Sequence, residues 1–320
     1  EYLRISFGYV AMSVVLKDCS PSRTITLRNL SKIDSEKARF ARLGSIAREN
    51  LKNTQRLFFH NQAHDIKVFR ITSKLIPLAT HPVTENWDWF VEVKDELKTM
   101  GDYVRNNGFR LSAHPDHFTL LNSPREDVTE ASIRDLEYHL RTLDGMGLDS
   151  SAKLVIHVGG SYKNKEASLE RFIQNYKLLS SDLKQRIVLE NDDKIYTVRD
   201  VLGLCQELKI PMVLDIHHHW CNNHNDNIGD YWEDIFATWD GETRPPKIHL
   251  SSPKDAKNFR SHADNIEASF FLDFLAQAKQ LDRDFDVMIE AKNKDLALFN
   301  LMEDLKKISH IKFVDEVSIE

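Results

Sequence analysis

The sequence predicts a closed (β/α)8 TIM barrel, because short apolar runs alternate eight times with helical patterns along its 320 residues. That count favours a closed barrel over an open, doubly wound sheet. No G-x-G-x-x-G follows the first apolar run, so the signature of a dinucleotide-binding sheet is missing. No linker, low-complexity segment or further repeat interrupts the alternation, and we expect residues 1–320 to form one domain.

Each predicted strand is a short run rich in branched and aromatic residues, which favour the extended conformation. The first run, LRISFGYV at residues 3–10, leads into a polar loop at 18–29 that contains Pro21. Apolar runs such as KLVIH and RIVLE suit strands that are covered on both faces. The seven later strands are predicted at residues 67–72, 109–114, 153–157, 186–190, 211–215, 247–250 and 286–290.

The segments between these strands carry helical patterns that end at helix-stop signals. One helix stops at Asn107-Gly108, and the next stops at Gly147. The helices are predicted at residues 31–60, 87–106, 129–146, 168–179, 198–208, 228–239 and 266–279, with a last one that ends near residue 307.

Composition limits the class of protein. Hydrophobic residues make up 41% of the chain, which is enough for a large core. The net charge of −6 argues against a general nucleic-acid binder, although carboxylates committed to divalent ions would count as negative in that sum. Any DNA surface would therefore be a local basic patch.

The cysteines and the hydropathy indicate where the protein works. Cys19, Cys205 and Cys221 show neither zinc-finger spacing nor a disulfide framework, which favours a reducing compartment. No apolar run approaches the roughly 20 residues of a membrane helix, and no signal peptide is visible. We therefore expect a cytoplasmic protein that does not bind membranes.

The stretch IPMVLDIHHHW, at residues 210–220, carries the strongest local signal. An apolar run ends at Asp215 and is followed by His217, His218 and His219, as in a buried strand that opens into a polar site. Asp215-x-x-His218 offers an oxygen and a nitrogen ligand one turn of loop apart, a pair that suits zinc, manganese or iron better than calcium. A solvated histidine-rich loop is the alternative.

Similar residues end five other predicted strands, and catalytic groups of TIM barrels lie at the carboxyl ends of the strands. A single histidine or glutamate there is usually structural or a helix cap. Six neighbouring strand ends would instead bring charged groups together, which is costly unless cations lie between them. Eight candidates exceed the needs of one four-coordinate ion and suit two or three ions that share a carboxylate. The candidate metal ligands are His114, His157, Glu190, Asp215, His218, His249, His262 and Glu290, with His81 nearby in the loop after the second strand.

Clustered divalent ions most often serve hydrolysis, because they activate a bridging water and bind both oxygens of a scissile phosphodiester. A sugar isomerase or epimerase on the same barrel is the main alternative, although such enzymes usually use fewer histidines. A DNA-damage binding module with structural metals is a third, non-enzymatic hypothesis.

The chain resembles the UV damage endonuclease family, which is related in fold to the three-metal endonuclease IV group. The resemblance covers about residues 3 to 292. It rests on the ordered segments FGYVAM, FRITSKLIPLATHP, SAHPDHF, VIHVGGSY, LENDD, LDIHHHWCN, PKIHLSS, SHAD and IEAK.

This resemblance implies incision of double-stranded damaged DNA immediately 5′ of cyclobutane pyrimidine dimers and 6-4 photoproducts, leaving 3′-hydroxyl and 5′-phosphate ends. Abasic sites are further candidate substrates, and no obligate protein partner is expected. The implied cofactor is manganese, with three ions in the site; zinc, magnesium and cobalt are alternatives that such ligands accept.

The resemblance also assigns roles. Glu190 would bridge two ions, and His81 would lie near the scissile phosphate. The three implied ligand sets are His114 and His157 with Glu190; Asp215, His249 and Glu290; and His218 with His262.

Lys247 lies two residues before His249, so both side chains should point to the same face of the strand. An ammonium aimed at a metal cluster is electrostatically unfavourable. We expect either that CO2 carboxylates Lys247, which then acts as an anionic catalytic ligand, or that the lysine extends to a phosphate.

Reading of the lesion is assigned to aromatic residues, because damaged base pairs stack poorly and are less costly to extrude. His117-Phe118 follows the third strand, where some family members carry Gln-Tyr. Tyr9 is expected to pack on the flipped lesion, with core packing as its alternative. Phosphate contacts are expected from a basic cluster at the rim, made of Lys163, Lys165, Arg244, Lys254, Lys257 and Arg260.

Overall fold

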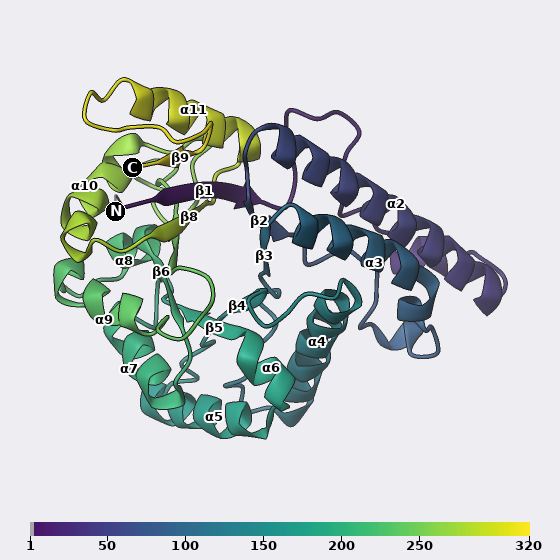
Figure 1. The fold of residues 1–320 in the computed structure, drawn as a ribbon. Helices are drawn as coiled ribbons and strands as arrows, with labels where there is room; N and C mark the ends of the chain where they lie inside the picture. Colours follow the sequence, from purple (N-terminus) through teal and green to yellow (C-terminus); the bar gives the residue numbers. More distant parts are fainter. Residues whose placement is uncertain (1–2) are drawn as a thin grey trace.

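The computed structural model describes residues 3–320 and confirms the predicted barrel (Figure 1). Parallel strands pair in chain order from β2 to β8, and β1 (Ile5–Val10) closes the ring by pairing with both β8 and β2. The other barrel strands are β2 (Val68–Ile71), β3 (Arg110–Ala113), β4 (Lys153–His157), β5 (Ile187–Glu190), β6 (Met212–Asp215), β7 (Lys247–Leu250) and β8 (Phe285–Ile289).

Helices surround the strands, and their side chains make the main core (Figure 1). Capping side chains fix where several helices begin. The Ser35 hydroxyl caps α2, and Thr197 and Asp200 form a capping box at α7. The helices of six or more residues are α2 (Glu36–Ala63), α3 (Trp89–Asn106), α4 (Glu126–Gly145), α5 (Lys165–Leu178), α6 (Ser181–Arg186), α7 (Val198–Leu208), α8 (Ile216–Cys221), α9 (Trp232–Ala237), α10 (Ala268–Ala278) and α11 (Lys294–Lys306). None of these helices is long and apolar enough to cross a bilayer, within the part of the chain that the structure describes.

Short elements depart from the predicted pattern. The predicted polar loop at 18–29 contains the start of α1 (Leu27–Leu30), and α6 was not predicted. The predicted helix at 228–239 is divided, because Tyr231 (φ −125°) interrupts it between η2 (Ile228–Asp230) and α9. The carboxyl-terminal strand β9 (Ser318–Ile319), which was also not predicted, pairs antiparallel with the start of β1.

Strand register places polar side chains inside the barrel. His157 pairs with Glu190, Asp215 with His249, and residues in register point to the same face of a sheet. Deeper in the barrel, an apolar cluster of Val155, Val188, Val213 and Trp239 fills the space. An apolar layer from β4, β5 and β6 therefore separates the polar carboxyl ends of the strands from charged pairs at their amino ends, such as Arg110 with Asp286 at 2.7 Å.

Closure of the barrel depends on Gly8 in β1, which pairs with Val68 of β2. A Cβ added at Gly8 would lie 1.8 Å from the carbonyl oxygen of Val68. A side chain at this position would force the first two strands apart, so only glycine allows them to pair.

We predict that Gly8→Ala lowers the free energy of unfolding by about 2 kcal/mol or more, as expected of overpacking between backbones. Urea unfolding followed by circular dichroism measures this loss. Gly203→Ala is the matched control, because nothing lies within 4 Å of its added Cβ and alanine favours helix α7 by up to about 1 kcal/mol. Equal stability of the two variants would contradict the role given to Gly8.

Candidate metal centre

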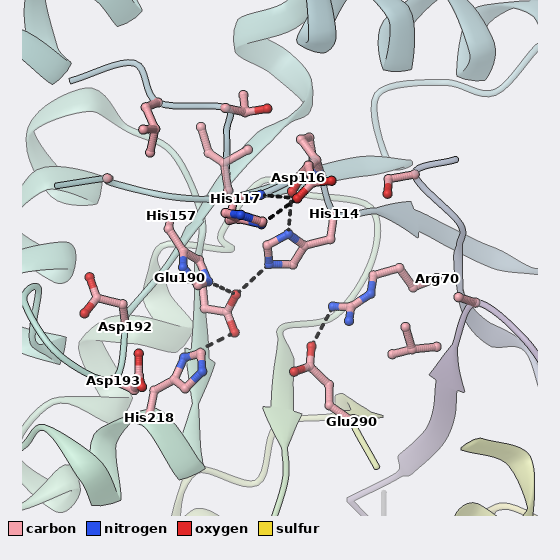
Figure 2. Close-up of a pocket in the computed structure, with 18 of the residues that line it drawn as sticks. Arg70, His114, Asp116, His117, His157, Glu190, Asp192, Asp193, His218 and Glu290 are labelled. Atoms are coloured by element: carbon pink, nitrogen blue, oxygen red, sulfur yellow. Dashed lines mark hydrogen bonds and ion pairs between the residues drawn. The ribbon is translucent and has the colours of Figure 1, made fainter. Parts of the chain in front are cut away.

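A cavity of about 610 Å³ opens at the carboxyl ends of the barrel strands. Figure 2 shows histidines and carboxylates from different strands pointing into it. The lining residues predicted as ligands are His114, His157, Glu190, His218, His262 and Glu290.

Glu190, at the end of β5, is the group shared by most of these side chains. Its Oε2 lies 3.0 Å from His114 Nε2 and 2.9 Å from His157 Nε2, and its Oε1 lies 2.8 Å from His249 Nδ1 (Figure 2 shows the first two). The carboxylate is only 1% exposed. Burial raises the pKa of Glu190, but His249, His114 and His157 outweigh it and hold the pKa well below its usual value.

Asp215 begins α8 directly after β6, so the predicted loop after this strand is a helical turn. One oxygen of Asp215 accepts the backbone N–H of His218 at 2.7 Å. The other oxygen, Oδ2, is buried without a hydrogen-bond partner among the described residues. Burial and the nearby Glu190 raise the pKa of Asp215 well above its usual value, although His218 opposes this. A cation beside Asp215 Oδ2 would give this oxygen a partner and would favour the ionised form of the buried carboxylate.

Asn191 orients this pair, and the sequence analysis missed it. Its side chain accepts the backbone N–H of Asp215 at 2.9 Å and donates to the Asp215 carbonyl at 3.0 Å. Its own carbonyl lies 2.8 Å from His218 Nδ1. The position directly after Glu190, at a strand end, was the only signal in the sequence that could have identified it.

Glu290 follows β8, and its carboxylate is held by a residue that was not predicted. Arg70, in β2, donates from Nη1 to Glu290 Oε1 at 2.6 Å (Figure 2). His249 Nδ1 lies 3.3 Å from the same oxygen, and His262 Nε2 lies 3.8 Å from Oε2. Burial raises the pKa of Glu290, but Arg70, His249 and His262 together outweigh it and the net shift is downward. Arg70 was missed because only ligand-type residues were sought at the strand ends.

The donor set fits divalent ions. Three groups of residues bring their ligand atoms within 4.8 Å of one another. Every group contains Glu190, as expected if one carboxylate is shared among ions. The groups are His114, His157 and Glu190; Glu190, Asp215 and His218; and Glu190, His249 and Glu290.

Two of the implied sets are therefore regrouped. The first set is as expected, but Asp215 lies with His218, and His249 with Glu290. His218 was assigned with His262, which belongs to none of the three groups among the described residues. The Asp215-x-x-His218 spacing had indicated this pair: Asp215 is the N-cap of α8 and His218 lies one turn later, so they face the same point.

Two residues predicted near the chemistry do not line this cavity, as the described residues form it. His81 caps η1 (Pro82–Thr84), where its Nδ1 accepts the backbone N–H of Val83, and the cavity lining formed by residues 3–320 does not include it. Tyr9 is fully buried, its hydroxyl donates to Asn61 at 2.7 Å, and its ring packs on Phe69. The prediction that Tyr9 packs on a lesion is wrong for this conformation, because the side chain faces the helices and not the mouth.

Lys247 is 2% exposed inside the barrel, so the alternative in which it extends to a phosphate is wrong. Its Nζ donates to Ser112 Oγ at 2.9 Å. Burial, with Arg110 and Arg70 nearby, lowers the pKa of Lys247 well below its usual value.

Some of the residues predicted at the rim of the barrel mouth lie there, and others do not. His117 and Phe118 follow β3, and their side chains are strongly exposed, with ring centroids 3.9 Å apart. Arg244 precedes β7, so it lies at the opposite end of the barrel, where it donates to the carbonyl of Phe109. Lys165 pairs with Asp200 at 2.5 Å. The other predicted basic residues, Lys163, Lys254, Lys257 and Arg260, are exposed in loops that follow β4 and β7.

A sugar epimerase shares the architecture of this barrel. The 3-keto-D-glucoside 4-epimerase YcjR of E. coli aligns with a TM-score of 0.55 at 12% identity, over 95% of this chain and 99% of that one. At this identity the likeness shows the fold alone and does not favour the isomerase alternative.

Stronger similarity covers almost the whole chain. This protein is 44% identical to the UV DNA damage endonuclease of Halalkalibacterium halodurans over 320 residues, which is 99% of each chain. The crystal structure of SacUVDE aligns with a TM-score of 0.83 at 32% identity, over 95% of this chain and 99% of that one. Residues 5–320 match the family described as UV-endonuclease UvdE. The chain belongs to the UV-endonuclease UvdE family.

Proposed function

We propose that this protein is a UV DNA damage endonuclease, a phosphodiester hydrolase that cuts double-stranded DNA immediately 5′ of a photoproduct. Cyclobutane pyrimidine dimers and 6-4 photoproducts are the proposed lesions, abasic sites a further substrate, and 3′-hydroxyl and 5′-phosphate ends the products. Chromosomal DNA as substrate would place this activity in the cytoplasm. The observation that carries the proposal is a family match over residues 5–320 in a chain whose three ligand groups share Glu190.

The proposed cofactor is a cluster of three manganese ions held by the strand-end ligands around Glu190; zinc, magnesium and cobalt also bind such ligands. Divalent ions bound there would activate a water and offset the charge of the phosphodiester. The chain itself orients the ligands: Asn191 fixes Asp215 and His218, and Arg70 fixes Glu290. Loss of such partners of the ligands typically lowers metal affinity or activity about 10- to 100-fold.

Lesion recognition is proposed for His117 and Phe118. Both are exposed, and His117 lines the cavity, so the pair can reach a base step above the catalytic groups. Filling the gap left by an extruded base favours distorted DNA, because unstacking a damaged pair costs less than unstacking an intact one.

We propose that Lys247 is carboxylated and serves as an anionic group beneath the cluster. An amine must be neutral to attack CO2, and burial together with two arginines favours the neutral form of Lys247. Lys153, another buried lysine of the barrel, is paired with Glu242 at 2.7 Å, whereas Lys247 donates to a hydroxyl. Lys247 therefore lacks the carboxylate partner that Lys153 has, and carboxylation would supply a negative charge at this position.

For activity, we predict that purified protein with Mn²⁺ nicks UV-irradiated supercoiled plasmid and leaves unirradiated plasmid largely intact. Glu190→Gln should lose at least about a hundredfold in rate while still binding irradiated DNA, because all three ligand groups share its carboxylate. Gel analysis of the plasmid and of a labelled duplex measures rate, position and end chemistry. Equal nicking of the two plasmids would rule out the proposed function.

For the metal, we predict that Mn²⁺ raises the midpoint of thermal unfolding, because it binds the folded state. Glu190→Gln should lose most of this shift, and the exposed His310→Gln should keep it. Binding should strengthen as pH rises through neutrality. The carboxylates around His218 outweigh its burial and raise its pKa to about 10, so a bound metal has to displace protons. Calorimetry in buffers of different ionisation enthalpy measures that release, and a pH-independent affinity would contradict the assignment.

For Lys247, we predict a carbamate carbon signal in the NMR spectrum of protein equilibrated with ¹³C-bicarbonate. Lys247→Gln should lack that signal, and Lys153→Gln should retain it because Lys153 is already paired with a carboxylate. A spectrum of the folded wild-type protein without this resonance would leave Lys247 as a plain amine.

A further inference from the structure

We infer that Trp220, together with Phe259 and Arg260, forms a second nucleobase-binding surface beside the cavity. This inference rests on the proposed function, because its ligand is an unstacked base of damaged duplex DNA. The three residues are called the Trp220 platform below. The site assignments made above for lesion recognition do not include Trp220 or Phe259.

Trp220 packs against three neighbouring rings and is still half-exposed. Its ring stacks on that of His217 with 6.0 Å between centroids and 19° between planes. Phe259 and Phe270 meet it edge-on at 6.1 Å and 5.8 Å. Even so, 47% of the Trp220 side chain is exposed. A rigid, half-open indole is the kind of surface on which a base stacks, whatever its sequence.

The surroundings carry positive charge. Residues 253–262 form a loop closed by a β-bridge between Pro253 and His262. This loop exposes Lys254, Lys257 and Arg260 against a single acid, Asp255. The Arg260 guanidinium lies 4.6 Å from the centroid of the Phe259 ring. An aromatic surface flanked by exposed cations matches a nucleic acid, in which bases alternate with phosphates.

The platform is continuous with the candidate metal centre. Trp220 belongs to α8, whose N-cap is the candidate ligand Asp215, and the loop of Phe259 ends at His262. His217, beneath Trp220, contacts the His262 ring edge-on at 5.7 Å. Arg260 Nε donates to the carbonyl of Asp193, which lines the cavity, and lies 3.7 Å from the Asp193 carboxylate. DNA bound over the cavity would therefore pass within reach of the platform.

The Trp220 platform and the His117-Phe118 pair lie at different strand ends, which suggests that they bind different bases. That pair follows β3, whereas the platform is built from segments that follow β6 and β7, on the far side of the ring of strands. The two aromatic surfaces thus lie on opposite sides of the barrel mouth. Extrusion of a lesion disturbs bases on both strands of the duplex, and two separated surfaces can hold one from each strand.

Tryptophan fluorescence gives a direct test. The chain has five tryptophans, and the other four are at most 7% exposed, so Trp220 is the residue that acrylamide should quench. We expect a saturating UV-irradiated duplex to protect Trp220 from quenching, measured in the Glu190→Gln protein so that the duplex stays intact. Trp220→Phe, which keeps an aromatic ring, should abolish the quenchable fraction with and without DNA.

Affinity provides the second readout. We expect Trp220→Ala to weaken binding to the irradiated duplex about tenfold, the loss typical of one stacked base. Phe59→Ala is the matched control: Phe59 is 52% exposed on α2, outside the barrel, and its loss should leave affinity unchanged. Trp220→Ala should also keep the thermal shift produced by Mn²⁺, which shows that the ligands next to it remain in place.

The outcomes separate the two proposals. If irradiated plasmid is nicked but saturating duplex leaves Trp220 fully quenchable, the platform is refuted and the proposed function stands. If anisotropy of a labelled irradiated duplex shows no binding, the proposed function and the platform both fail. A tenfold loss of affinity in Trp220→Ala that is matched by loss of the Mn²⁺ shift would assign Trp220 to metal-site packing and overturn the platform.

Discussion

Glu190 holds histidines from three other parts of the barrel on its two oxygens, at 2.8–3.0 Å. The carboxylate is buried, so its charge is not screened by water and must be met by those rings or by ions. Each histidine therefore has to approach from its own strand end with little freedom. This shared contact explains why groups far apart in the chain converge on one point.

The barrel makes such convergence reachable, because all strand ends meet at one mouth. It also creates a cost, since several acids and imidazoles share a small volume with limited water. Contacts within the protein offset part of that cost. Arg70 pairs with Glu290, and the Asn191 side chain accepts a hydrogen bond from the backbone N–H of Asp215. The buried Asp215 Oδ2 has no hydrogen-bond partner among the described residues and lies 3.5 Å from His218 Nδ1, and there a cation would complete the arrangement. The polar mouth thus offers ligand groups that could hold cations.

Much of this could be predicted from the sequence because the barrel repeats one rule: a strand ends, and its last inward side chain enters the mouth. That rule locates Glu190 and Asp215 without coordinates. It does not specify how all the ligands group: the spacing of Asp215 and His218 indicated that pair, whereas the grouping of His249 with Glu290 and without Asp215 depends on the three-dimensional arrangement. Tyr9 sits one residue from the inward-facing Val10, and such a shift moves a side chain to the outer face. Arg244 was misplaced for a simpler reason: it precedes its strand.

Electrostatics links the metal centre to DNA binding in an acidic chain. The carboxylates of Glu190, Asp215 and Glu290 lie at the mouth, with Arg70 as the cation paired to one of them. The loop at 253–262 exposes three cations and attracts a phosphodiester from the side. Attraction at the rim would let the duplex dock first on its flanks. Ions bound at the mouth would then offset the charge of the scissile phosphate, so metal binding serves cleavage at the centre while the rim serves affinity.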